Sequence, residues 1–259
     1  MRYGGHTSCL ALSHDEDPPT LLLDAGTGIR RASELLNGAP FRGSIVLSHL
    51  HWDHVHGLPF FSRADRDDAR TTVYLPAQGA GSDPLEVLAR GMSPPHFPVR
   101  PDGLRGTWRI VGLEPGVHEI EGFRVSVDEI PHKGGRTYGV RVDDGGGSLV
   151  YMPDHCPSDL GPGPDGWGEY HPSAMSLVAG ADVLVHDAQI LAEELEAMAY
   201  LGHAAAEYAV GLGRHAGVER VVLFHHHPDR TDDEIDAIVG RFADSPGVSA
   251  ATQSTVLRL

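Results

Sequence analysis

Cysteine is scarce in this sequence of 259 residues, which contains only Cys9 and Cys156. Two isolated cysteines exclude a disulfide framework and lack the paired spacing of a thiolate metal site, so a reducing compartment is the simpler interpretation. Long apolar runs are missing as well. The longest, Leu21–Leu23 and Ser176–Val185, are far too short to span a bilayer, and the first residues lack the apolar core of a signal peptide. We therefore expect a soluble, cytoplasmic protein without a membrane partner.

Basic residues are also few, since 20 lysines and arginines stand against 36 aspartates and glutamates, for a formal charge of -16. A chain this acidic repels phosphate backbones and anionic lipid over most of its surface, so we do not expect nucleic acid as a partner. Hydrophobic residues (41%) and charged residues (22%) are at ordinary globular levels, which excludes a disordered, collagen-like or coiled-coil chain. A chain of this length buries roughly three quarters of its unfolded surface.

Strand-like and helix-like patterns are mixed along the chain, with most of the helical periodicity in the C-terminal half. We find no internal repeat and no low-complexity linker, so we predict one α/β domain over residues 1–259. The predicted strands are Thr7–Leu12, Thr20–Asp24, Ser44–Ser48, Thr72–Leu75, Trp108–Val111, Phe123–Ile130, Thr137–Val142, Ser148–Met152, Asp182–His186 and Arg220–Phe224. The predicted helices are Ile29–Asn37, Pro84–Gly91, Ser173–Ala179, Leu191–Tyr200, Ala204–Ala216 and Asp232–Phe242.

Histidine is abundant, with 17 residues, and its densest cluster is His49-Leu50-His51-Trp52-Asp53-His54, directly after the apolar run Ile45–Leu47. Three imidazoles and a carboxylate this close together need solvent or a cation to satisfy them. In an extended segment His49 and His51 point the same way, while Asp53 and His54 lie at the far end of the turn. This arrangement suits two metal ions side by side.

With Leu21–Gly28 upstream, the His-x-His-x-Asp-His run resembles the metallo-β-lactamase-fold hydrolase superfamily, and the resemblance extends over nearly the whole chain. It implies an αββα sandwich with a dinuclear metal site at one edge and further ligands in fixed order. His132 looks like the third-motif histidine and Asp154 like the bridging aspartate. His225 looks like the last histidine, although His226 and His227 compete with it; an extended loop would put His225 and His227 on one side.

The resemblance therefore implies two sets of metal ligands. The first ion would be held by His49, His51, His132 and Asp154, and the second by Asp53, His54, Asp154 and His225. Such N/O ligands suit two zinc ions, with manganese or iron as alternatives. Asp24 is expected to orient one of the ligand imidazoles.

The surroundings of His132 indicate a branch of the superfamily. The Pro-Gly-His-Thr context of many thioesterases, lactonases and β-lactam hydrolases is absent, and His51 stands where flavo-diiron proteins have Glu. What remains resembles the phosphodiesterase branch, which includes RNase Z and the cyclic phosphodiesterase of phosphonate breakdown. Val183–Ala188 looks like the His-Glu-Ala-Thr segment of that branch, and Gly202–Glu207 like its His-Ser-Thr segment, with alanines in place of both hydroxyl residues.

The activity implied is hydrolysis of a small or cyclic phosphodiester by a metal-activated hydroxide. Asp53 or Asp154 would accept a proton from the water, and His203, alone or together with His186, would protonate the leaving oxygen. The loops Arg90–Gly106 and Asp154–Pro172, with His96, Trp167, Tyr170 and His171, are candidate pocket walls. RNase Z carries a long tRNA-grasping arm between the third-motif histidine and the bridging aspartate, whereas 21 residues separate His132 from Asp154 here.

Two alternative functions stay open for this sequence. One is a non-phosphoryl hydrolase of the same fold acting on a lactone, thioester or β-lactam, and the other is an inactive metal-bound binding module. The substrate, the metal and the oligomeric state stay open, with a homodimer among the options. The sequence opens with Arg2-Tyr3-Gly4-Gly5 and lacks the extra first strand that relatives often carry ahead of a similar segment. It therefore does not determine which strand forms that edge of the sheet.

Overall fold

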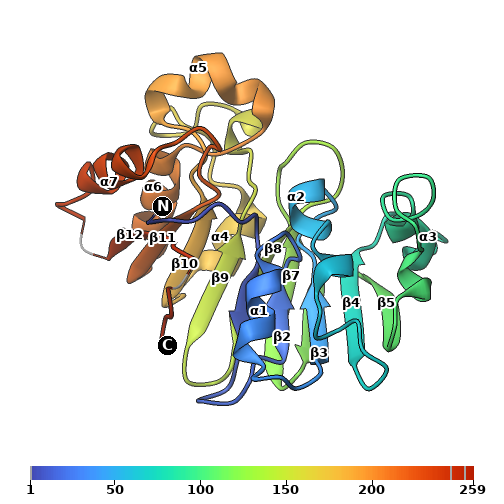
Figure 1. Cartoon of the computed structure of the whole chain (residues 1–259). Coiled ribbons are helices and arrows are strands. Elements are labelled where there is room, and N and C mark those ends of the chain that lie inside the picture. Colours follow the sequence, from blue (N-terminus) through green and yellow to red (C-terminus); the bar gives the residue numbers. More distant parts are fainter. Residues whose placement is uncertain (1, 246, 254) are drawn as a thin grey trace. The chain divides into compact units, whose positions relative to one another are not determined.

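The computed structural model describes residues 2–245, 247–253 and 255–259 (Figure 1). These residues form two compact units. The N-terminal unit comprises residues 6–114 and 119–122. The C-terminal unit comprises residues 115–118 and 123–259 together with the start of the chain up to Gly5. Two compact units can belong to one domain, so the single domain over residues 1–259 stays a prediction. Among the residues described, no helix combines the length and apolar character needed to cross a membrane.

The N-terminal unit is built on a five-stranded sheet of order β1-β2-β3-β4-β5 (Figure 1). Only β1 runs antiparallel to its neighbour, and the other strands are parallel. The strands are β1 (Leu10–Leu12), β2 (Leu21–Leu23), β3 (Arg42–Val46), β4 (Arg70–Pro76) and β5 (Thr107–Leu113). The helices are α1 (Ile29–Leu35), α2 (Trp52–Val55) and α3 (Pro84–Ala89), with the 3-10 turns η1 (Leu58–Phe60) and η2 (Pro101–Gly103).

The parallel register of this sheet places the ends of β2 and β3 together. Leu23 pairs with Val46, so the segments that follow both strands leave the sheet at the same edge. Asp24 follows β2, and the histidine run follows β3. Apolar side chains from both strands, such as the fully buried Leu22 and Ile45, anchor the edge in one hydrophobic core.

The C-terminal unit contains a seven-stranded sheet of order β12-β11-β10-β9-β8-β7-β6. The strands β7, β8 and β9 are antiparallel, while β9, β10, β11 and β12 are parallel. The strands are β6 (Gly116–Ile120), β7 (Phe123–Glu129), β8 (Tyr138–Asp143), β9 (Ser148–Met152), β10 (Val183–Asp187), β11 (Arg220–Phe224) and β12 (Val248–Ala250). The helical segments are α4 (Pro172–Val178), α5 (Leu195–Met198), α6 (Ala206–Ala216) and α7 (Asp232–Gly240), with η3 (Pro157–Leu160), η4 (Ala192–Glu194) and η5 (Ala199–Leu201).

The parallel part of this sheet again gathers polar residues at one edge. Asp154 lies two residues beyond β9, Asp187 ends β10, and His225 directly follows β11. The helices α4 and α6 pack on the sheet, α4 on β7 and β8 and α6 on β10 and β11. Their buried faces hold the strands that present these groups.

Several elements differ from expectation, and β6 and β12 were not expected at all. The helix expected at Leu191–Tyr200 is split into η4, α5 and η5, none of which buries a residue fully. The helix α2 begins inside the histidine run, where an extended segment and a turn were expected. His225 has a φ of 55°, so the residues after β11 do not continue as an extended loop.

Candidate metal centre

In the N-terminal unit, the carboxylate of Asp24 holds the histidine run in place. Its Oδ1 accepts the backbone N–H of Ser48 at 2.6 Å, and its Oδ2 accepts the Ser48 hydroxyl at 2.9 Å. The same Oδ2 lies 2.7 Å from Nδ1 of His54. Asp24 and His54 are both fully buried. The orienting contact expected of Asp24 is therefore present, on His54.

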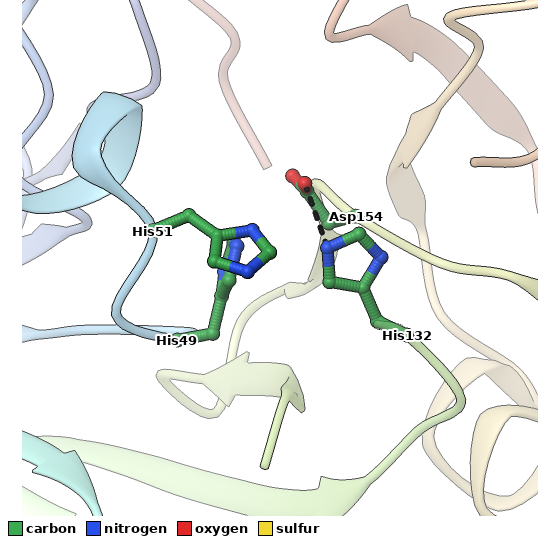
Figure 2. Close-up of side chains that lie close together, drawn as sticks. All are labelled: His49, His51, His132 and Asp154. Carbon is green, nitrogen blue, oxygen red and sulfur yellow. Dashed lines mark ion pairs between the residues drawn. The ribbon is translucent and has the colours of Figure 1, made fainter. Parts of the chain in front are cut away.

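The four polar side chains of the histidine run lie close together. The rings of His49 and His51, drawn in Figure 2, have centroids 4.4 Å apart, and those of His49 and His54 are 4.1 Å apart. Nε2 of His54 lies 3.3 Å from Oδ2 of Asp53. Because α2 starts at Trp52, Asp53 and His54 sit in its first turn, and His51 is the N-cap.

In the C-terminal unit, the buried carboxylate of Asp154 meets an imidazole on each oxygen. Oδ2 lies 3.4 Å from Nε2 of His132, the pair joined by the dashed line in Figure 2. Oδ1 lies 3.4 Å from Nε2 of His225. Asp154 is 1% exposed.

The other ring nitrogens of these two histidines have protein partners. Nδ1 of His132 lies 2.7 Å from the carbonyl oxygen of Gly202, and Nδ1 of His225 lies 3.0 Å from the amide of Gln189. Burial lowers the pKa of His132, while the Asp154 carboxylate opposes that effect. A neutral imidazole is the form that binds a metal ion.

Among the three consecutive histidines, His225 is the one that contacts Asp154. Burial lowers the pKa of His226 to about 4, and its ring lies 6.1 Å from that of Tyr3. Nδ1 of His227 accepts the backbone N–H of Asp229 at 3.3 Å.

His203 lies in the same cluster, and its partner is Asp187. Nδ1 of His203 is 2.9 Å from Oδ2 of Asp187 and 3.8 Å from Oδ2 of Asp154. Its ring stacks on that of His225, with centroids 5.0 Å apart. Asp154, His203 and His225 could together hold a metal ion, because one ligand atom from each lies within 4.8 Å of the others.

Three backbone N–H groups hold the Asp187 carboxylate besides His203. They come from His155 and Ala204 on Oδ2 and from Gln189 on Oδ1, at 3.0 to 3.2 Å. The sequence does not indicate this role of Asp187, nor the contacts of Gln189 and His155. Its one signal is the position of Asp187 at the end of a strand.

The side chain of His186 is fully buried, and both of its ring nitrogens are engaged. Nε2 lies 3.0 Å from Nδ1 of His155, and Nδ1 donates to the backbone carbonyl of Asp187 at 2.8 Å. Burial lowers the pKa of His186. Its role as a proton donor stays a prediction.

The expected pocket walls are partly packed inward. Trp167 and Tyr170 lie against the hydrophobic core of the C-terminal unit, and the Tyr170 hydroxyl donates to Asp165 at 2.9 Å. His171 is the N-cap of α4, and His96 is exposed. These contacts give Trp167 and Tyr170 a structural role.

Known proteins resemble this chain over most of its length. Ribonuclease Z of Lacticaseibacillus casei is 27% identical over 85% of this chain and 79% of its own. Ribonuclease BN of Escherichia coli O1:K1 is 28% identical over 83% of this chain and 81% of its own. The metallo-beta-lactamase fold protein YhfI of Bacillus subtilis superposes with a TM-score of 0.69 at 18% identity, covering 99% of this chain and 95% of that one.

These findings confirm the α/β class and the metallo-β-lactamase fold expected from the histidine run. The donor sets in both units are of the kind that binds divalent metal ions. The profile of the beta-lactamase superfamily domain matches residues 20–226. The chain therefore belongs to the beta-lactamase superfamily, a family of hydrolases.

Proposed function

We propose that this chain is a phosphodiesterase that hydrolyses a small or cyclic phosphodiester with two divalent metal ions. The observation that carries the proposal is the pairing of His203 with Asp187, next to the imidazole-flanked carboxylate of Asp154. An alkoxide leaving group needs a proton as it departs, and a histidine held this way can donate that proton. The names of the two curated relatives, both ribonucleases, also favour chemistry at phosphorus.

The metal ligands would form two sets. His49, His51, His132 and Asp154 would hold the first ion, and Asp53, His54, Asp154 and His225 the second. Zinc is the expected metal, with manganese or iron as alternatives.

The donor chemistry fits such ions. Nδ1 of His54 and Nδ1 of His132 are already held by protein oxygens, which leaves Nε2 as the ligand atom. Nε2 of Gln189 faces Nδ1 of His225; with the amide turned over, the Gln189 oxygen would face Nδ1 instead and have the same effect. One Nε2 atom faces each oxygen of Asp154, so this carboxylate would belong to both ligand sets.

When bound, the ions supply an activated water and neutralise charge on the phosphoryl oxygens. Asp53, 38% exposed at its side chain, would accept a proton from that water. Asp187 keeps the Nδ1 proton of His203 in place, so the protonated ring gives up its Nε2 proton to the leaving oxygen. The backbone N–H groups around Asp187 keep its carboxylate oriented for this task.

One experiment tests this function against its alternatives. The protein is purified without added metal, bound metals are measured by elemental analysis, and four substrates are assayed in parallel: a phosphodiester, a phosphomonoester, a lactone and a thioester. We expect turnover of the diester above the other three. Faster turnover of the lactone or thioester would instead identify a non-phosphoryl hydrolase, and no turnover of any substrate with metals bound would favour a binding module.

A further inference from the structure

Trp52 is the most exposed large apolar side chain among the described residues of the N-terminal unit, at 72%. The other two tryptophans, Trp108 and Trp167, are partly buried against the cores of their units. A single exposed apolar residue is common on protein surfaces, so exposure alone indicates little. The position of Trp52 in the histidine run is what distinguishes it.

Trp52 is the first residue of α2 and lies between His51 and Asp53, both proposed metal ligands. The Cα atom of Trp52 therefore lies about 3.8 Å from the Cα atom of each of these two residues. Its ring stacks on His56, one helical turn later, with centroids 5.1 Å apart and an angle of 21° between the planes. His56 is itself exposed. The stack holds the indole as a flat surface beside the histidine run.

The net charge of the chain indicates what such a surface offers a substrate. With a formal charge of -16, the protein repels an anionic phosphodiester at long range. Contacts with an uncharged part of the substrate would offset this repulsion. A flat, exposed indole suits a planar aromatic ring, because stacking on an aromatic side chain needs no charge and depends little on which base is bound.

We propose that Trp52 is a stacking platform for the base of a nucleoside phosphodiester, so that the substrate class of this site is a small nucleotide diester. This inference rests on the proposed function, because it places the reacting phosphorus at the proposed metal ligands. Trp52 acts here in substrate specificity and takes no part in proton transfer.

Two substrates with the same reacting group test this assignment. Adenosine 2′,3′-cyclic phosphate carries a base, and methyl riboside 2,3-cyclic phosphate does not. Trp52→Ala should raise KM for the first substrate roughly 5- to 100-fold and leave KM for the second within twofold. Trp52→Phe should bring KM for the first substrate most of the way back to the wild-type value. Leu35→Ala, which removes another exposed apolar side chain of the same unit, should change neither value. Bound metal should be equal in all four proteins.

Equal effects of Trp52→Ala on both substrates, or no effect on either, would overturn the inference. If the wild-type protein hydrolyses neither diester, the proposed function is contradicted. A separate measurement then tests the base-binding role of Trp52. Calorimetric titration of the metal-loaded protein with adenosine 5′-monophosphate and with ribose 5-phosphate then reads base binding directly. Tighter binding of the nucleotide that is lost in Trp52→Ala supports the platform, and equal binding of both ligands contradicts it.

Discussion

Asp154 is the residue on which both proposed metal positions depend. Its two oxygens each face an imidazole at 3.4 Å, and it is almost fully buried. We predict that Asp154→Ala loses both metal ions, because a bridging ligand contributes to each, whereas His51→Ala loses one. Elemental analysis of the purified variants gives the metal equivalents per chain. Asp159→Ala removes an exposed carboxylate of the following segment and should retain both ions. Two equivalents in Asp154→Ala would rule out bridging.

His203 can be tested by the choice of leaving group. A diester that releases an alkoxide needs a proton on the departing oxygen, whereas one that releases p-nitrophenolate needs little help. We predict that His203→Ala lowers turnover of an alkyl diester roughly 10²- to 10⁴-fold and keeps most activity on the p-nitrophenyl diester, with metals retained. Asp187→Asn should show the same dependence, since it acts through Nδ1 of His203. Equal losses on both substrates would mark His203 as a residue that positions the substrate.

His186 makes folding stability depend on pH. Burial lowers its pKa in the folded protein below the ordinary value near 6.5. Below that value the unfolded chain binds more protons than the folded one, so stability present near neutral pH is lost as pH falls. We predict that His186→Gln reduces the loss of unfolding free energy between pH 7.5 and pH 5.5. Urea unfolding at the two pH values measures it, and an unchanged difference relative to wild type would contradict the assignment.

At the scale of elements, α2 is held by backbone contacts to the loop after β2. The N–H of Ala25 donates to the carbonyl of His54 at 2.7 Å, and the N–H of Gly57 donates to the carbonyl of Ala25 at 2.8 Å. A Cβ atom at Gly57 would lie 2.0 Å from the carbonyl oxygen of Gly26, a backbone atom that cannot give way easily. Glycine at position 57 is therefore a condition for presenting the histidine run.

We predict that Gly57→Ala lowers the free energy of unfolding by about 1–3 kcal/mol or more and reduces bound metal. Chemical denaturation and elemental analysis provide the two readouts. The matched control is Gly240→Ala at the end of α7, where an added Cβ meets nothing within 4 Å and stability should stay level or rise slightly. A Gly57→Ala protein as stable and as metal-rich as wild type would show that α2 can move away from the loop.

The strands were the most predictable elements because their apolar residues are local and dense. Ser148–Met152 and Arg220–Phe224 match β9 and β11 at both ends. The four-residue helix α2 is too short to show a helical period, and tertiary hydrogen bonds from Ala25 support it instead. The strand β12 has three residues and only partial burial, so its sequence carries little pattern.

The proposed ligands could be named from sequence because the dense histidine motif carries the family resemblance, and the resemblance implies the ligands that follow. Their partners could not, since these contacts join distant parts of the chain. Gln189 reaches His225 across 36 residues, and His132 reaches the carbonyl of Gly202 across 70. His155 directly follows Asp154 in the sequence, yet it contacts His186 and donates its backbone N–H to Asp187. The parallel order of β9, β10 and β11 brings His155, Asp187 and His225 to one edge of the sheet.

At the scale of the whole molecule, the two curated relatives are named as ribonucleases, so RNA is the substrate to compare with a small diester. Between His132 and Asp154 the chain forms the strands β8 and β9 joined by a short turn. By the family resemblance, this hairpin occupies the interval in which RNase Z carries its tRNA-grasping arm. The acidic excess of 36 carboxylates over 20 basic residues acts in the same direction, because RNA binding draws its affinity from cations placed against phosphates.

We therefore predict that the metal-loaded protein binds tRNA weakly, with a dissociation constant above about 0.1 mM even at 50 mM salt. A protein that neutralises several phosphates releases as many counterions, so its affinity falls steeply with salt, by about 0.7 to 0.9 logarithmic units per phosphate for each tenfold rise. Fluorescence anisotropy with labelled tRNA between 25 and 200 mM salt measures both quantities. Turnover of a small cyclic diester by the same preparation serves as the control for an intact site. Micromolar binding with a steep salt dependence would show that basic residues gather in an RNA-binding surface despite the net charge, and the small-diester assignment would then give way to a ribonuclease.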